Sequence, residues 1–253
     1  MVDVELAKKR FLKYTEKFDL KNENIERKQQ HSLRVMQISK EIAKKMKLEK
    51  EKIKLAALIG LLHDIARFEQ YTIYGTFRDF DSIDHGDYGV QILEKDIRKY
   101  INVDEYDEII KKSVKNHNKY KIEEGLDIEE ELFAKIVRDA DKIDIIYEAV
   151  DTFWKKEKDV LEIEHGKLSE KMLEDFYSYM VSNSLNSASR ADQILRFASF
   201  IFDINFKCSF EMLKENDNIS KMIDRFNYQI PETREEMQKI KQFANDYIKE
   251  KTK

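Results

Sequence analysis

Residues 56–67 read AALIGLLHDIAR, an apolar helical segment that places a histidine directly before an aspartate. His63 follows Ala56 and Gly60 at i−7 and i−3, so the three residues share one helix face. Gly60 has no Cβ, which lets a second helix approach closely one turn before the histidine. The segment therefore predicts that His63 and Asp64 are buried at a contact between helices.

The rest of the chain favours an all-α fold. Its 253 residues contain one proline and six glycines, fewer than sheets and long loops usually need for their turns. Apolar periodicity predicts helices over 3–18, 25–47, 50–67, 85–100, 104–118, 129–150, 168–183, 187–214 and 232–251. Two segments break this pattern: residues 71–84, which we expect to form a loop or lid, and residues 119–127.

Composition also limits the partners of the chain. Charged residues make up 38% of it but nearly cancel to a net charge of −4, whereas nucleic-acid-binding proteins usually carry a basic excess. We therefore expect no stable nucleic-acid partner. The most apolar run, residues 55–62, is far shorter than the ~20 residues that span a bilayer, so no membrane association is expected. The single cysteine, Cys208, and the absence of a visible signal peptide favour a cytoplasmic location.

Four of the five histidines form an ordered series with two aspartates. The series consists of His31, His63, Asp64, His85, His117 and Asp141. Each of its histidines lies on an apolar helix face or at the start of one, as His31 does with Val35 at i+4. Imidazole and carboxylate groups are the usual ligands of catalytic divalent metals. A lone histidine on such a face is usually a hydrogen-bonded core residue, but burying several unpaired polar groups would cost roughly 1–3 kcal/mol each. A shared cation offsets that cost, so the series predicts a metal centre.

Two aspartates compete for the last position in the series. Asp141 follows Val137 and Phe133 at i−4 and i−8, whereas Asp139 follows a lysine and a glutamate at these spacings. The pattern favours Asp141 as the ligand and leaves Asp139 at the surface or behind the ligands. The remaining histidine, His165, lies in a polar stretch and is expected at the surface.

Residues 56–67 resemble the signature helix of the HD superfamily of metal-dependent phosphohydrolases. The superfamily pattern is a histidine, then a His-Asp pair, then an aspartate, which His31, His63-Asp64 and Asp141 match in order. The family's glycine-lysine ending is Ala66-Arg67 here, so the positive charge is kept and the glycine is not.

The resemblance covers residues 25–150 and implies an HD-domain helical bundle there. We expect this core to belong to a single all-α domain over residues 1–253, with residues 151–253 as a C-terminal helical extension.

His85 and His117 resemble the additional ligands of HD members that hold two metals. Those members include cyclic-dinucleotide phosphodiesterases and hydrolases of symmetric diadenosine polyphosphates. The resemblance implies that one ion is held by His31, His63, Asp64 and Asp141, and a second by Asp64, His85 and His117. Asp64 would bridge the two ions. The glycine-tyrosine-proline segment of the HD-GYP subfamily is absent after His117, so that subfamily is not assigned. The donor set leaves iron, manganese, cobalt, nickel and zinc open.

The same resemblance implies hydrolysis of a phosphate ester or anhydride by activated water, with Asp64 at the centre of the site. Oxygens on the reacting phosphorus require positive partners, for which Arg67 and Lys142 are the candidates. Arg67 could instead form a salt bridge at a helix end. The aromatic residues of the segment 71–84 could stack a nucleobase or pack on the core. We expect a small phosphorylated substrate, in particular a nucleotide.

Two other functions remain open from the sequence. A di-iron oxygenase of the HD type would use a similar ligand set, and a regulatory module could keep the metal with little catalysis. Cations near the site would favour the hydrolase. The aromatic C-terminal helices could support a homodimer.

Overall fold

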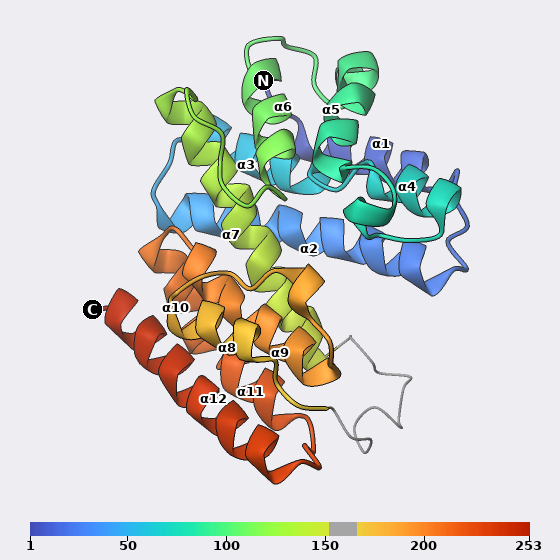
Figure 1. Cartoon of the computed structure of the whole chain (residues 1–253). Coiled ribbons are helices and arrows are strands. Elements are labelled where there is room, and N and C mark those ends of the chain that lie inside the picture. Colours follow the sequence, from blue (N-terminus) through green and yellow to red (C-terminus); the bar gives the residue numbers. More distant parts are fainter. Residues whose placement is uncertain (152–165) are drawn as a thin grey trace. The chain divides into compact units, whose positions relative to one another are not determined.

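The computed structural model describes residues 1–151 and 166–253 (Figure 1). These residues form helices, turns and loops without any strand, which confirms the predicted all-α fold. The chain divides into two compact units, Met1–Asp141 and Lys142–Lys253. A single domain over the whole chain stays a prediction. None of the described helices combines the length and apolar character needed to cross a membrane. His165 lies outside the described residues.

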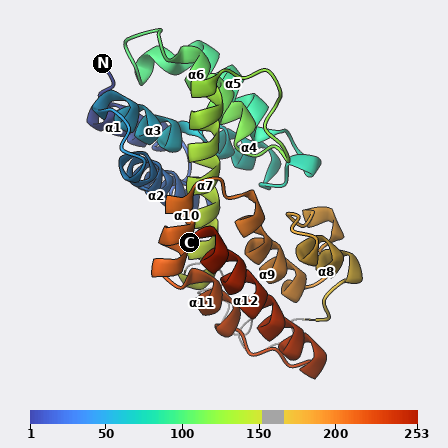
Figure 2. The ribbon, with the colours of Figure 1, turned by 90° about the vertical axis from the view of Figure 1, so that its left-hand side faces the viewer.

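The first unit is a helical bundle with α3 at its centre. Its elements are α1 (Val4–Thr15), α2 (Glu23–Lys45), α3 (Lys50–Leu62), α4 (Arg67–Tyr74), η1 (Asp79–Asp81), α5 (His85–Asp96), η2 (Ile97–Lys99), α6 (Asp107–Asn116) and the first part of α7 (Ile128–Asp151). Helix α3 packs against α1, α2 and α6, and α5 packs against α6. Figure 2 shows α1, α2 and α3 on one side of this unit and α4, α5 and α6 on the other.

The contact between α2 and α3 is as close as the sequence predicts. A Cβ on Gly60 would lie 2.5 Å from Ser39 Oγ and 2.8 Å from the Val35 carbonyl oxygen. Every residue from 55 to 62 is buried. The glycine therefore lets α2 pass directly over the end of α3 that precedes His63.

Two boundaries in this unit differ from the predicted ones. The helix predicted over 50–67 ends at Leu62, and a turn separates it from α4. Helix α4 continues to Tyr74, so a loop beginning at residue 71 is wrong for its first four residues. Gly75 ends α4 with a left-handed φ of 67°, a conformation that glycine adopts without steric cost.

The second unit contains shorter helices gathered around a long terminal one. Its elements are the rest of α7, α8 (Glu170–Tyr177), η4 (Ser184–Asn186), α9 (Arg190–Ser199), η5 (Phe200–Asp203), α10 (Lys207–Glu215), α11 (Asn218–Asp224) and α12 (Pro231–Lys251). Helix α12 packs against α9, α10 and α11, as Figure 1 shows for the last two. The single helix predicted over 187–214 is wrong, because η5 and extended backbone separate α9 from α10. Helix α11 was not predicted.

Aromatic residues of the second unit pack on one another. The ring of Phe176 lies 5.1 Å from that of Phe202 and 5.6 Å from that of Phe243, measured between centroids. Tyr247 lies 5.1 Å from Phe202. These contacts bury aromatic surface inside the unit, and a homodimer stays a prediction.

Candidate metal centre

The predicted ligands come together in the first unit from five places in the chain. Five of them are at most 4% exposed, and the Asp141 side chain is 14% exposed. Their positions are α2 for His31, the end of α3 for His63 and Asp64, the first residue of α5 for His85, the end of α6 for His117, and α7 for Asp141. Their role as ligands stays a prediction, which the distances below support.

One group of donor atoms surrounds a point between α2, α3 and α7. His31 Nε2 lies 3.2 Å from His63 Nε2 and 3.1 Å from Asp141 Oδ1. Asp64 Oδ2 lies 3.4 Å from the first imidazole nitrogen and 3.5 Å from the second. Ligands about 2.1 Å from one ion lie roughly 3–3.5 Å from each other, so this group fits a divalent metal.

A second group shares the other oxygen of Asp64. His85 Nε2 and His117 Nε2 each lie 3.4 Å from Asp64 Oδ1 and 3.0 Å from each other. The two oxygens of one carboxylate thus face two different sets of imidazole nitrogens. This is the arrangement required of a carboxylate that bridges two ions.

Backbone carbonyls fix the orientation of two of these rings. His63 Nδ1 donates to the Gly60 carbonyl oxygen at 2.7 Å, and His117 Nδ1 donates to the Val114 carbonyl oxygen at 2.6 Å. A carbonyl oxygen can only accept, so in each neutral ring the proton lies on Nδ1 and Nε2 carries a lone pair. Both Nε2 atoms are therefore presented as metal ligands.

A carboxylate performs the same task for His85. Its Nδ1 donates to Asp79 Oδ2 at 2.6 Å, which leaves a lone pair on its Nε2 as well. The Nε2 atoms of His85 and His117 thus direct lone pairs at each other across 3.0 Å. Lone pairs this close repel unless a cation lies between them, so the ring orientations fit a metal.

The surroundings of Asp64 and His85 favour the protonation states that bind metal. Burial alone would raise the pKa of Asp64, but the charges of Lys28 and Arg67 outweigh it and hold that pKa well below its usual range. Burial, with a contribution from Arg67, lowers the pKa of His85 to about 3. Metal binding at neutral pH would therefore not have to displace protons from these groups.

Residues 29–146 match the family model described as HD domain. This region is an HD domain. The matched range contains all six predicted ligands, and HD domains mark a superfamily of metal-dependent phosphohydrolases that bind divalent metals. No curated protein and no solved structure matches the chain.

Two cations contact the shared carboxylate, Arg67 from within the matched range and Lys28 from just before it. Arg67 Nε lies 3.4 Å from Asp64 Oδ1, and the same guanidinium donates to the Phe77 carbonyl oxygen at 2.6 Å. Lys28 Nζ lies 2.7 Å from Asp64 Oδ2 and its side chain is 12% exposed. The sequence did not single out Lys28, although it precedes His31 by three residues on α2 and so shares its face.

The structure decides between the two positions expected for Asp139, at the surface or behind the ligands. This residue is fully buried, which excludes the surface and leaves the alternative of a position behind the ligands. Ile136 and Val137 beside it are buried too. Helix α7 is buried on all sides around Asp139. The lysine and glutamate that precede Asp139 at i−4 and i−8 therefore did not indicate an exposed face.

Asp139 is the more buried of the two aspartates, so burial does not single out Asp141. Asp141 is the candidate ligand because its Oδ1 lies 3.1 Å from His31 Nε2 and 3.6 Å from His63 Nε2. The predicted catalytic Lys142 pairs with Asp203 at 2.8 Å, and its role at a phosphate stays a prediction.

Arg138 is a second contributor that the sequence did not reveal. Its side chain is 2% exposed, and its Nη1 donates to the carbonyl oxygens of Asn116 at 2.6 Å and Lys119 at 2.7 Å. It thereby fastens the segment that carries His117 to α7, next to Asp141.

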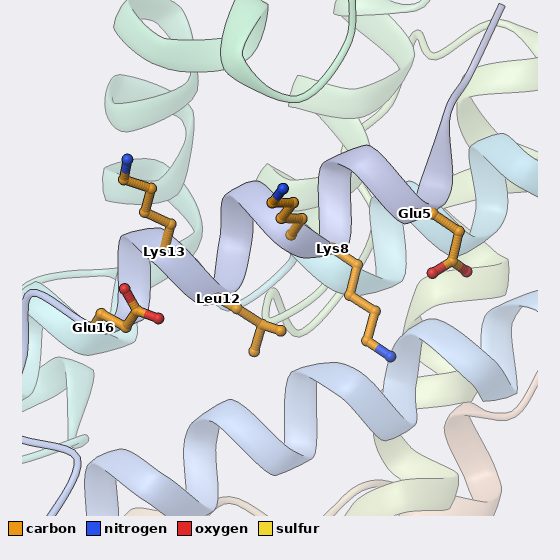
Figure 3. Close-up of a pocket in the computed structure, with 6 residues that line it drawn as sticks. Glu5, Lys8, Leu12, Lys13 and Glu16 are labelled. Carbon is orange, nitrogen blue, oxygen red and sulfur yellow. The ribbon is translucent and has the colours of Figure 1, made fainter.

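A surface hollow elsewhere in the first unit lacks any of this chemistry. It lies along α1 and is lined by Glu5, Lys8, Lys9, Leu12, Lys13 and Glu16 (Figure 3). All of these side chains come from α1 and its C-cap residue Glu16, and none belongs to the histidine series. The hollow is therefore not a candidate site.

Proposed function

We propose that this chain is a two-metal phosphohydrolase that cleaves a phosphate ester or anhydride of a small metabolite, in particular a nucleotide. The observation that carries the proposal is that the two oxygens of the Asp64 carboxylate face different imidazoles. Oδ2 faces His31 and His63, and Oδ1 faces His85 and His117. A centre with one ion would need only one of these groups.

Asp64 and the imidazoles would hold the ions, with Asp141 completing the first position. Bound divalent ions would supply positive charge against a phosphate and a water of lowered pKa. The contribution of the chain is to keep its donor atoms deprotonated and fixed, through the carbonyl contacts of His63 and His117. Orienting groups of this kind need no reorganisation when the reaction occurs.

Lys28 and Arg67 support phosphate as the group that the site binds. Both lie against Asp64, so their charge is directed at the centre of the site rather than at solvent. Oxygens on a reacting phosphorus gain negative charge, which cations at this position would stabilise. Their position matches the charge that develops on a reacting phosphate, and this favours the hydrolase over the oxygenase.

The ring of Phe77 supports a nucleotide within this class. It lies 4.7 Å from the ring of Tyr71, and the cationic groups of Lys28 and Arg67 lie 5.6 and 5.7 Å from its centroid. An aromatic face next to phosphate-binding cations suits a base joined to a phosphate. The neighbouring Phe80 is 81% exposed, so one ring of this loop is accessible to a ligand.

The proposal is tested by phosphate release from a panel of nucleoside monophosphates, cyclic dinucleotides and dinucleoside polyphosphates. Protein stripped with a chelator and then supplied with Mn²⁺, Fe²⁺, Co²⁺, Ni²⁺ or Zn²⁺ should release phosphate or a nucleotide from at least one class. The stripped protein should be inactive. Activity that is equal in both preparations would contradict a metal-dependent mechanism.

A further inference from the structure

Asp79 is a carboxylate beside the second group of donors that accepts hydrogen bonds from four side chains. Its Oδ2 accepts from His85 Nδ1 at 2.6 Å and from Asn118 Nδ2 at 3.1 Å. Its Oδ1 accepts from Arg67 Nη1 at 3.0 Å and from Gln70 Nε2 at 2.9 Å. Four donors from three separate segments thus converge on one side chain, which belongs to the loop between α4 and α5.

We propose that Asp79 is a positioning residue for His85, and that it couples occupancy of the second metal position to the order of residues 75–84. This inference rests on the proposed two-metal function and deepens it. It assigns a role to an acidic residue that lies outside the histidine series.

His85 needs such a partner because of its place in the fold. His63 and His117 each close a helix, and their Nδ1 atoms bond carbonyls of that same helix. His85 is the first residue of α5, so no preceding turn of its own helix offers a carbonyl to its ring. The Asp79 carboxylate takes that place and holds the ring with a charged acceptor.

The same contact makes the loop sensitive to the ion. A cation on Nε2 withdraws electron density from the imidazole and makes the Nδ1 proton a stronger donor, which would tighten its bond to Asp79. Linkage requires the converse, that a well-held Asp79 strengthens binding of the cation. The loop also carries Phe77, whose carbonyl oxygen accepts a hydrogen bond from Arg67. The order of the loop therefore affects a cation that the proposed function assigns to the substrate phosphate.

An Asp79→Asn variant tests the positioning role. Each oxygen of Asp79 faces two donors, so the NH₂ group of an asparagine would oppose donors in either orientation. Binding of Mn²⁺, followed by calorimetry and by metal content per chain, should show the second equivalent weakened by roughly 10–100-fold. The first equivalent should be unchanged. Asp79→Glu, which keeps the charge but shifts the carboxylate, should recover part of the loss.

Asp81→Asn is the matched control. Asp81 lies in the same loop and pairs with Arg78, and its side chain is 42% exposed. This variant should bind both equivalents as the wild type does. Two tight equivalents in Asp79→Asn would overturn the inference and leave the proposed function standing. One equivalent in the wild type would instead overturn the two-metal proposal itself.

A measurement on the wild type keeps the inference testable if Asp79→Asn does not fold. The side chain of Arg78 is 70% exposed, which makes it a site for trypsin inside the loop. Cleavage after Arg78 should slow as the second Mn²⁺ equivalent binds. A cleavage rate that stays constant through that step would show that the loop is not coupled to the ion.

Discussion

The two halves of the candidate metal centre share Asp64 but are supported in different ways. His31 and His63 lie where α2 passes closely over α3, and this half is embedded in helix packing. His85 and His117 lie at helix ends, and the ring of His85 is held by a loop carboxylate. Packed helices resist displacement more than loops do. We therefore expect the first ion to bind more tightly than the second.

The largest effect should come from the residue that both halves share. Asp64→Asn removes charge from both positions, so metal content should fall for both ions and phosphate release should drop on the order of 10²–10³-fold. Asp81→Asn, an exposed acid in the same unit, should behave as wild type. Loss of only one ion in Asp64→Asn would show that the carboxylate does not bridge.

Replacing a glycine by alanine in each half should show which half is packed more rigidly. In Gly60→Ala the new Cβ would meet the Val35 carbonyl oxygen at 2.8 Å, and backbone cannot yield easily. We expect the free energy of unfolding to fall by about 1–3 kcal/mol in urea titrations. In Gly89→Ala the Cβ would meet only the Val114 Cγ1 at 2.9 Å among close atoms, and a side chain can shift. A larger cost at Gly89 than at Gly60 would contradict the comparison.

Acid should destabilise the metal-free protein through its buried imidazoles. Burial lowers the pKa of His63 and His85 in the folded state, so below pH ~6.5 the unfolded chain binds protons that the folded chain does not. The free energy of unfolding should be highest above pH 6.5 and fall by at most about 1.4 kcal/mol per pH unit for each histidine below it. Urea titrations of chelated protein at pH 7.5, 6.0 and 5.0 measure this. The fall in the free energy of unfolding should be smaller in the His85→Ala variant. An identical pH dependence in the variant and the wild type would argue against a buried, neutral His85 ring.

Replacement of Lys28 should have the smallest effect, and it should change kcat/KM and metal affinity in opposite directions. Lys28→Met removes a cation that bonds Asp64 Oδ2, so kcat/KM for the phosphorylated substrate should fall roughly 10-fold, the effect of one charge-assisted hydrogen bond. Metal affinity should rise, because the ammonium no longer competes for that oxygen. Lys44→Met, at an exposed lysine on the same helix, is the control. A fall in metal affinity would show that Lys28 supports the site only structurally.

Helical periodicity was sufficient to predict most helices of the first unit and the histidines that the fold brings together. The buried stripes containing His31, His63 and His117 predicted which elements would converge, and Gly60 predicted the close helix contact. These features lie within single helices, where spacing along the chain determines the face on which a residue lies.

The contributors that the sequence did not reveal act across elements. Asp79 reaches His85 from a loop, and Arg138 reaches α6 from α7, so no spacing along the chain identifies either. The break between α9 and α10 has neither glycine nor proline to mark it. Asp139 is buried because α7 is enclosed on all sides, which an amphipathic pattern cannot indicate.

Metal content per chain tests the two-metal centre most directly. It should be measured on protein purified without added metal, for the wild type, His85→Ala and His117→Ala. Two ions in the wild type and one in each variant would agree with a carboxylate shared between two positions. One ion in all three proteins would contradict it and remove His85 and His117 from the ligands.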